Sequence, residues 1–477
     1  MSHIQLVNRF RWVYCQLENL RHCLPPSVRS TLDELPESLD ATYERVLREI
    51  KKPNRGHALR LLQCLVVAIR PLRVEELAEV LAVDFKDAEG MLKLNASWRW
   101  EAQEQALLSS CSSLISIVDH DDDGGGGDDD DNDYRDHDSR AVQFSHFSVK
   151  EFLTSPRLAT PNRDVSNYQI VLEHAHTIMA HACLSVLLRS DDQVKRTDVR
   201  NNSPLARYAA EHWATHAQFE NVSSSLRRAM EYLFDVDKPY FATWLELHDI
   251  DTYLFKSTFY QFAPMQSSIS RAGPLYYAAL CGFQDLAEHL IVKYPQEVNA
   301  HGGYYVTPFV AALAKKHFQL AQLLHRHGSS VDPRGHFRRT PLHSAAFYGD
   351  LEMIQALLEY KADINARNDG GRTPLFEAVE LDQYEAVRLL FEYGADPNIP
   401  GYHDDSGAPL HIASITGKSE VVRLLLDHGV DVDAVDGSGK TAFQLALANG
   451  HDEIATLLSA RGTDGSSTPA TKYSFVS

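Results

Sequence analysis

The 477-residue chain lacks an apolar run long enough to cross a membrane. Its longest apolar segments, such as LLQCLVVAI (Leu61–Ile69), have about half the length that a transmembrane helix needs. The first residues, MSHIQLVNRFRWVYCQLENL, carry arginines and a glutamate where a secretory signal has a continuous apolar segment. We therefore expect neither a transmembrane helix nor a signal peptide. The predicted compartment is the cytoplasm, with the nucleus as an alternative.

Cysteine is also scarce, and no two cysteines form a C-x-x-C pair. Such wide spacing is typical of reduced, mostly buried thiols in a cytosolic protein rather than of a disulfide framework or a zinc site. The six cysteines are Cys15, Cys23, Cys64, Cys111, Cys183 and Cys281.

Positive charge is outnumbered, and the net charge is −19. About half of it comes from Asp119–Asp138, which holds eleven aspartates against one arginine. The remainder is mildly acidic, which argues against nucleic acid or an anionic membrane as a main partner. The aspartate-glycine segment lacks the spacing of a calcium loop, so we expect a flexible, solvated acidic loop.

The last third of the chain repeats itself with a period near 33 residues. Six segments begin at Gly273, Thr307, Thr340, Thr373, Ala408 and Thr441, which are 34, 33, 33, 35 and 33 residues apart. The phrase TPLHSAA and this period resemble the ankyrin repeat. In that fold Thr340 and Thr373 cap helices, and the prolines after them occupy the first helical position. Glycines at 349, 417 and 450 suit the turn between paired helices.

The octet AVDGSGKT (Ala434–Thr441) has the loose form of a nucleotide-binding P-loop. Aligned with the preceding repeats, however, Thr441 falls on the helix-capping threonine and Gly439 on a hairpin glycine. A P-loop needs a buried strand directly before it, whereas DHGVDVD is the polar exit of a helix. We therefore predict a hairpin turn, with no nucleotide or other cofactor bound.

The first two-thirds of the chain show a different pattern. Apolar residues at helical spacing predict an amphipathic helix within residues 1–24 and further helices over Leu35–Ile50, His57–Ile69 and Arg73–Val83. Two strand-like runs follow, Ser113–Asp119 and Ala141–Val149, on either side of the acidic segment. Helices followed by a hairpin are typical of a winged-helix domain.

Three phrases in this part, ELPESLDATYERVLREI, IRPLRVEELAEVLAV and VQFSHFSVKEFLTS, resemble the region downstream of the NACHT nucleotide-binding domain in large fungal NLR-like proteins. The resemblance covers roughly residues 10–155 and, more loosely, PLARYAAEHWATHAQFE (Pro204–Glu220). Such proteins usually end in ankyrin, WD or TPR repeats. The NACHT module itself, with its P-loop, would lie before Met1, so its ATP switch is not carried over to this chain.

Other candidate sites favour structural interpretations. The helix over Arg73–Val83 is expected to expose Glu75, Glu76 and Glu79, which would repel DNA phosphates. His212 and His216 have a spacing that can hold zinc, but no third ligand is evident, so helix packing is favoured. His146 lies between Ser145 and Ser148 without the G-x-S-x-G elbow of a hydrolase. We therefore predict no metal site and a protein that is not an enzyme.

The predicted fold is mainly α: a winged-helix-like domain (1–160) with an acidic wing insert (119–139), a helical connector (161–268), six ankyrin repeats (269–464) and a disordered tail (465–477). The predicted function is a protein–protein interaction scaffold that binds a protein partner through the concave ankyrin face. The alternative is a regulatory, ligand-sensing part of a NACHT-type signalling NTPase. A DNA-binding regulator would need a basic surface, and none is evident.

Partner choice is expected to fall to hairpin tips and exposed first-helix positions, where aromatic and arginine side chains are typical anchors. An open alternative for Phe347, Tyr348 and Leu381 is that each merely covers the neighbouring repeat. The predicted partner-binding residues are Tyr304, His336, Phe337, Arg339, Phe347, Tyr348, Arg372, Glu380, Leu381, Tyr402 and Lys440.

Overall fold

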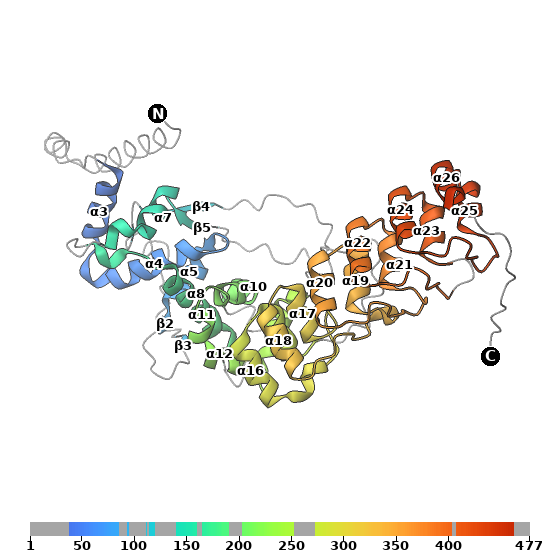
Figure 1. Ribbon diagram of the computed structural model, residues 1–477. Helices are drawn as coiled ribbons and strands as arrows, with labels where there is room; N and C mark the ends of the chain where they lie inside the picture. The colour runs from blue at the N-terminus through green and yellow to red at the C-terminus, as the bar shows by residue number, and fades with distance from the viewer. Residues whose placement is uncertain are drawn as a thin grey trace. The chain divides into compact units, whose positions relative to one another are not determined.

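A computed structural model divides the chain into two compact units, Met1–Tyr260 and Gln261–Ser477 (Figure 1). The structure describes residues 38–84, 93–94, 111, 114–119, 140–159, 165–189, 203–251, 272–402 and 407–461. The amphipathic helix expected before residue 25, most of the acidic insert and the tail lie outside these residues. The described part is mainly helical, which confirms the predicted fold class.

The described part of the first unit begins with helices around a small antiparallel sheet. Helices α3 (Leu39–Glu49), α4 (Arg55–Val67) and α5 (Val74–Leu81) precede the hairpin of β4 (Ile115–Asp119) and β5 (Arg140–Phe144). The sheet order is β1-β5-β4, because the two residues of β1, Leu72 and Arg73, pair with the free edge of β5. A second ladder joins β2 (Val83–Asp84) to β3 (Lys93–Leu94).

The second predicted strand, over Ala141–Val149, is too long. Strand β5 ends at Phe144, and α7 (Phe147–Thr154) follows at once. The His146 side chain accepts a hydrogen bond from the backbone amide of Ser148 and so caps this helix. The composition of residues 145–149 favours a strand, but the cap formed by His146 satisfies a helical N–H group and starts a helix there instead.

Two long helices form the centre of the rest of the first unit. Helix α8 (Leu172–Leu187) packs against α10 (Ala206–Ala217) and against α4. Beyond them come α11 (Val222–Ser225), α12 (Arg227–Leu233) and α13 (Tyr240–Leu247). Their core is aromatic, since the Trp213 ring lies 5.3 Å from Trp244 and 6.1 Å from Phe234.

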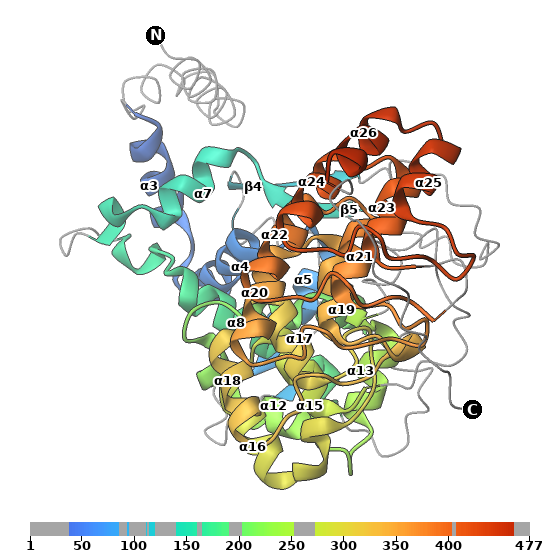
Figure 2. The same cartoon turned by 45° about the vertical axis from the view of Figure 1, so that its right-hand side comes forward.

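The described part of the second unit contains six consecutive helix pairs, which stack in two rows (Figures 1 and 2). The first helices of the pairs are α15 (Pro274–Cys281), α17 (Pro308–Ala314), α19 (Pro341–Tyr348), α21 (Pro374–Glu380), α23 (Pro409–Thr416) and α25 (Ala442–Ala448). The second helices are α16 (Gln284–Lys293), α18 (Phe318–Arg326), α20 (Leu351–Glu359), α22 (Tyr384–Glu392), α24 (Ser419–Asp427) and α26 (Asp452–Arg461).

The repeated phrase sets the boundaries of these helices. Thr340 and Thr373 occupy the N-cap positions of α19 and α21, with proline at the first helical position, as predicted. His343 completes the cap, because its Nδ1 atom accepts from the Thr340 amide and its Nε2 atom lies 2.9 Å from the Arg372 carbonyl of the next hairpin. The capping residues thereby also join successive repeats.

The turns inside the helix pairs need a left-handed residue. Gly349, Gly417 and Gly450 have φ angles of 68°, 76° and 76°, which confirms their predicted role. Lys316 and Asp382 take the same position with φ of 62° and 61°, although a side chain is strained there.

Polar side chains link the loops that leave the second helices. Four Asn or Asp residues are spaced 33 residues apart. The side-chain oxygen of each accepts a hydrogen bond from a backbone amide of the next repeat, with N···O distances of 2.7–3.0 Å. These side-chain oxygens provide hydrogen-bond acceptors for backbone amides of the following repeat. The hydrogen bonds therefore fix the position of each loop relative to the next one. The four acceptors are Asn299, Asp332, Asn365 and Asn398.

Candidate functional site

Five hairpins connect the six helix pairs, and each is closed by a similar backbone hydrogen bond. The amides of Gly302, Gly335, Asn368, Gly401 and Asp436 donate to carbonyls four or six residues further on, over 2.9–3.1 Å. The hairpins project from the same side of the stack as one another (Figure 2). We call the exposed side chains of these hairpins and of the first helices the hairpin face.

The hairpin face carries several exposed aromatic and apolar side chains. The exposed fractions are 67% for Phe337, 60% for Tyr402, 44% for Tyr348 and 40% for Leu381. His336 and Lys440 are also exposed, while Tyr304 is half-buried. Exposed apolar side chains that lie together on one surface are typical of binding sites.

Phe337 stands in strained backbone. Its φ is 54° and that of Arg338 is 51°, whereas glycines supply the left-handed residue in later hairpins, as Gly371 and Gly439 do. A left-handed conformation costs a bulky side chain about 1–2 kcal/mol. The Phe337 carbonyl accepts the amide of Asp369, so the next hairpin holds it in place. Strain that is retained at an exposed side chain is a common mark of a functional position.

The Arg339 side chain binds other side chains of the protein. Its Nη2 atom donates to both carboxylate oxygens of Glu377, which is fully buried and also accepts from Asn368 Nδ2 at 2.9 Å. Burial raises the pKa of Glu377, and the Arg339 charge opposes that shift. The guanidinium of Arg339 lies 5.1 Å from the centre of the Phe347 ring. Sequence reasoning did not identify Glu377 as part of this face.

Arg372 and Glu380 form a second pair on this face. Their side chains meet at 2.8 Å, and the Arg372 guanidinium lies 4.9 Å from the ring of Phe376. Two predicted anchors therefore bind each other directly. Both side chains remain partly exposed, at 29% and 27%.

A tyrosine cluster lies beside these pairs. The Tyr304 ring is 4.9 Å from Tyr305, and Tyr348 is 5.1 Å from Phe347. Burial raises the pKa of the Tyr348 hydroxyl, and its hydrogen bond with Tyr304 acts in the same direction. Tyr304, in the hairpin before α17, is thus brought beside Phe347 and Tyr348 of α19, which sequence spacing alone did not show.

A pair of arginines at 33-residue spacing fastens neighbouring hairpins. Arg334 donates to the Arg367 carbonyl at 2.9 Å, and Arg367 donates to the Pro400 carbonyl at 2.6 Å. The Arg367 guanidinium also lies 4.2 Å from the centre of the Tyr402 ring. This stacking orders the exposed Tyr402 ring.

The P-loop-like octet is a hairpin, as predicted. Asp436 Oδ1 accepts from the Ser438 amide at 2.9 Å and from the Lys440 amide at 2.8 Å. Thr441 caps α25, and Gly439 has φ of 79°. A phosphate cradle depends on free backbone amides, whereas two amides of this loop already bind a carboxylate of their own hairpin.

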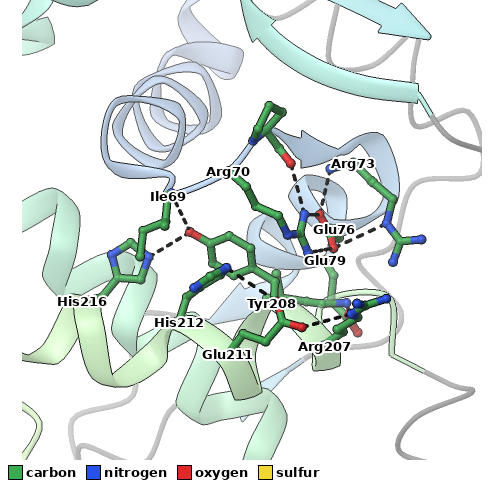
Figure 3. A network of polar contacts seen from close by, with 12 residues as sticks. Ile69, Arg70, Arg73, Glu76, Glu79, Arg207, Tyr208, Glu211, His212 and His216 are labelled. Carbon is green, nitrogen blue, oxygen red and sulfur yellow. Dashed lines mark hydrogen bonds and ion pairs between the residues drawn. The ribbon is translucent and has the colours of Figure 1, made fainter. Parts of the chain in front are cut away.

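Of the two histidines that could suggest zinc, His216 belongs to a buried network in the first unit, whereas His212 is half-buried and its Nε2 atom lies 3.6 Å from the Glu211 carboxylate (Figure 3). His216 shares one hydrogen bond with Tyr208 Oη and another with His176 Nδ1, each at 2.9 Å. Burial lowers the pKa of His216 to about 3, and His176 adds to the shift. Within the residues that the structure describes, no group of three His, Cys, Asp or Glu side chains is arranged to hold a metal ion.

Helix α5 was expected to expose Glu75, Glu76 and Glu79; Glu75 is half-buried, and for Glu76 and Glu79 the expectation is wrong. Both are buried, and Arg70 compensates the charge of Glu76 by donating to its two carboxylate oxygens at 2.6 and 2.8 Å (Figure 3). Glu79 accepts from Ser203 Oγ and from the Leu205 amide, each at 2.8 Å. Buried carboxylates need such partners, and the partners of Glu79 lie more than a hundred residues away in sequence.

Ser148 and His146 do come together. The Ser148 hydroxyl lies 2.6 Å from His146 Nδ1 and 2.9 Å from the hydroxyl of Tyr43, and all three belong to the packing of α7 against α3. Ser148 is buried, and the contact completes the helix cap.

The described cysteines and helices add two observations. Cys64, Cys111, Cys183 and Cys281 are buried thiols outside any disulfide, as predicted; the other two cysteines lie outside the described residues. No helix among the described segments is long and apolar enough to cross a membrane.

Comparison with known proteins identifies the repeats. Residues 309–401 and 400–468 match the family model for ankyrin repeats. The chain is 27% identical over 308 residues to "Azaphilone pigments biosynthesis cluster protein L" of Monascus ruber, covering 62% of this chain and 61% of that protein. That match is longer than the second unit and so extends into the first.

Shorter matches fall on proteins with other names. The chain is 45% identical over 58 residues to "ARF GTPase-activating protein Git" of Drosophila melanogaster, which is 12% of this chain and 8% of that protein. It is 36% identical over 66 residues to human "Protein phosphatase 1 regulatory subunit 27", 14% of this chain and 43% of that protein. The chain thus spans less than two thirds of each of these relatives. The helix pairs, their caps and the family match agree: residues 309–468 are ankyrin repeats.

Proposed function

We propose that this protein is a non-enzymatic scaffold that binds a protein partner through the hairpin face. The observation that carries the proposal is the exposure of Phe337, in strained backbone, on a face where Arg339 and Arg372 are already paired with Glu377 and Glu380. A rigid array that presents aromatic side chains loses little conformational entropy on binding.

The predicted anchors fall into two groups under this proposal. His336, Phe337, Tyr348, Leu381, Tyr402 and Lys440 are exposed and available for contact. Arg339, Phe347, Arg372 and Glu380 hold the framework and present only their outer edges, and Tyr304 supports Tyr348. The first group should therefore supply most of the binding free energy.

Affinity purification from cells of the source organism tests the proposal. The double variant Phe337→Ala/Tyr348→Ala should reduce capture of the partner by at least about tenfold, because exposed aromatic anchors dominate interfaces. A matched control removes two exposed apolar side chains from the second helices, as Val292→Ala/Phe318→Ala, and should leave capture unchanged. Unchanged capture by the first variant would exclude this face, and a large fall in its thermal midpoint would show that these side chains belong to the core.

A second proposal, that the chain is the sensing part of a NACHT-type signalling protein, has narrower support. The order β1-β5-β4, with helices before the β4–β5 hairpin, supports the winged-helix part of it. Mapping the 5′ end of the transcript and the mass of the endogenous protein tests this hypothesis. An extended product with a P-loop would support it, and a 53.6 kDa product starting at Met1 would contradict it.

A further inference from the structure

Three side chains of the first unit form a continuous line of hydrogen bonds. His176 on α8 meets His216 on α10 through their Nδ1 atoms, which are 2.9 Å apart. His216 Nε2 lies 2.9 Å from Tyr208 Oη, and Tyr208 Oη accepts the Ile69 amide at 3.2 Å (Figure 3). The line therefore runs from α8 through α10 to the turn between α4 and β1. We call His176, His216 and Tyr208 the histidine relay.

The contact between the two imidazole rings requires a single proton. A neutral imidazole has one N–H group and one bare nitrogen, which accepts hydrogen bonds. Two Nδ1 atoms can therefore form a hydrogen bond only when one of them is protonated and the other is bare. Two N–H groups at this distance would repel each other, and two bare nitrogens would have no proton between them.

Tyr208 determines which ring holds the shared proton. Among the described residues, the O–H group of Tyr208 has one acceptor within hydrogen-bond distance, His216 Nε2, because its other partner, the Ile69 amide, is a donor. His216 Nε2 is therefore bare, and the proton of His216 lies on Nδ1. From there it is donated to the bare Nδ1 atom of His176. The opposite arrangement would leave the Tyr208 O–H group without an acceptor, which is unfavourable because Tyr208 is fully buried.

Acid acts on the relay through His176, because His176 is half-buried while His216 and Tyr208 are fully buried. A second proton on the His176 ring gives its Nδ1 atom an N–H group, so His216 Nδ1 must become the acceptor. His216 then carries its own proton on Nε2 and donates it to Tyr208 Oη. His216 exchanges one proton for another when the contact opens transiently to water, so the relay gains one proton in total. The Tyr208 O–H group thereby loses its acceptor.

The surroundings of His176 disfavour a positive charge. Burial lowers the pKa of His176, and the positive charge of Lys150 on α7 adds to the shift. The ring of Phe219 stacks on the His176 ring with centroids 4.2 Å apart, and no carboxylate of the described residues forms an ion pair with His176. The other titratable groups that act on the relay, or on its neighbour His212, are Glu211, His248, Arg70, Glu76, Cys64 and Cys183.

The sign of the effect follows from these contacts. The folded unit takes up the second proton less readily than the unfolded chain, in which histidine titrates near its usual value of about 6.5. The stability that the relay contributes is therefore present at neutral pH and is lost as the pH falls below that value.

We propose that the histidine relay is a proton-driven switch, in which His176 and His216 share one proton at neutral pH and a second proton on His176 reverses the hydrogen bonds as far as Tyr208. The switch links α8 to the turn before β1, because Tyr208 binds the Ile69 amide and its ring lies 5.0 Å from the Arg70 guanidinium. All of these residues lie in the first unit, so the inference does not depend on the proposed partner-binding face.

Nitrogen NMR of the full chain with isotope-labelled histidine tests the proposal, because the chemical shift of a ring nitrogen distinguishes N–H from bare nitrogen. Comparison with His176→Asn and His216→Gln assigns the signals of the two rings. At about pH 8 we expect a bare Nδ1 on His176 and a proton on Nδ1 of His216. As the pH is lowered, protonation of His176 and movement of the His216 proton to Nε2 should follow one titration curve while tryptophan fluorescence shows a folded first unit.

Three results would overturn the proposal. A proton on His176 Nδ1 at about pH 8 would show that Tyr208 does not set the direction of the hydrogen bonds. A His216 ring that keeps its proton on Nδ1 while His176 becomes protonated would show that the rings separate instead of reversing their bond. Unfolding of the first unit before His176 is protonated would exclude a switch within the folded state.

A matched pair of variants tests the energetic consequence. Asn places an amide where the Nδ1 atom of histidine lies, so His176→Asn can still bond to His216 but cannot take up a proton. His174→Asn removes an exposed histidine from the same helix outside the relay. In urea titrations followed by tryptophan fluorescence, the unfolding equilibrium constant of wild type should rise from about pH 7 to about pH 5.

The two variants should differ in this rise. His176→Asn should reduce it at least about threefold, whereas His174→Asn should change it by less than about 1.5-fold. Equal reductions in the two variants would contradict the assignment of the titrating group to His176.

Discussion

The Nη2 atom of Arg339 lies 3.0 and 2.9 Å from the two carboxylate oxygens of Glu377, a buried residue of helix α21. The pair joins the hairpin before α19 to helix α21. A carboxylate in this position is stable only while its charge is compensated, since an unpaired buried charge is strongly destabilising.

Arg339→Ala should lower the free energy of unfolding of the second unit by about 1–2 kcal/mol, because Asn368 alone would then bind the buried carboxylate. Arg338→Ala, which removes an exposed neighbour, should change it by less than about 0.5 kcal/mol. Urea denaturation followed by far-UV circular dichroism measures both. Equal effects would mean that the pair does not stabilise the array.

Gly417 and Gly450 both have φ of 76°, yet their surroundings differ. A Cβ atom on Gly417 would lie 2.6 Å from the ring of His451, whereas a Cβ atom on Gly450 has nothing within 4 Å. Gly450→Ala should therefore cost about 1 kcal/mol from backbone strain alone. Gly417→Ala should cost clearly more, because the His451 ring would also lose its 3.0 Å hydrogen bond to the Ile415 carbonyl.

Thermal denaturation of these two variants gives the comparison. The result expected is a larger fall in midpoint for Gly417→Ala than for Gly450→Ala. Identical midpoints would show that His451 does not fasten the turn.

Asp436 should matter for stability, and Lys440 should not. Asp436→Ala removes the acceptor of the Ser438 and Lys440 amides, so it should destabilise the last repeats by about 1–2 kcal/mol. Lys440→Ala should leave stability unchanged. Calorimetry with ATP provides the functional readout: saturable micromolar binding that Lys440→Ala abolishes would contradict the hairpin assignment.

The first unit should lose stability in mild acid. His216 has a pKa of about 3 when folded, because burial disfavours its charged form, while an unfolded histidine titrates near 6.5. Between these values the unfolded chain binds more protons, so the free energy of unfolding falls as pH is lowered. From pH 6.5 to pH 5 this one residue accounts for about 2 kcal/mol.

Tryptophan fluorescence isolates this effect, because all five tryptophans of the chain precede residue 261. Urea titrations at pH 7 and pH 5 should show the loss of stability in wild type. His216→Gln should reduce the dependence on pH, although it lowers stability at pH 7 by disturbing Tyr208 and His176. An unchanged pH dependence in this variant would place the titrating group elsewhere.

Sequence periodicity predicts the second unit well, because its interactions recur. Caps such as Thr340, turn glycines such as Gly349 and the hairpin around Asp436 depend on residues within four positions of one another. The left-handed pair Phe337 and Arg338 carries no such signal, since the glycine that usually marks this position is missing. The next hairpin, through the Asp369 amide, stabilises that conformation.

The first unit was harder to predict, because its key contacts join distant segments. Glu79 meets Ser203, and His176 meets His216, and neither pairing follows from spacing along a helix. A run of glutamates on a predicted helix is usually solvated, so Glu76 was expected at the surface. Arg70 precedes Glu76 by only six residues, and this nearby cation is the one local feature that could have indicated the burial of Glu76.

Binding of a protein partner to the hairpin face can be tested by site-specific photo-crosslinking. A photoreactive phenylalanine analogue is placed at Phe337 in the full chain and, in a separate control, at Val292 on α16, which is 81% exposed. We expect a defined crosslinked protein from position 337 and none from position 292. Crosslinking of the same protein from position 292 but not from position 337 would contradict it.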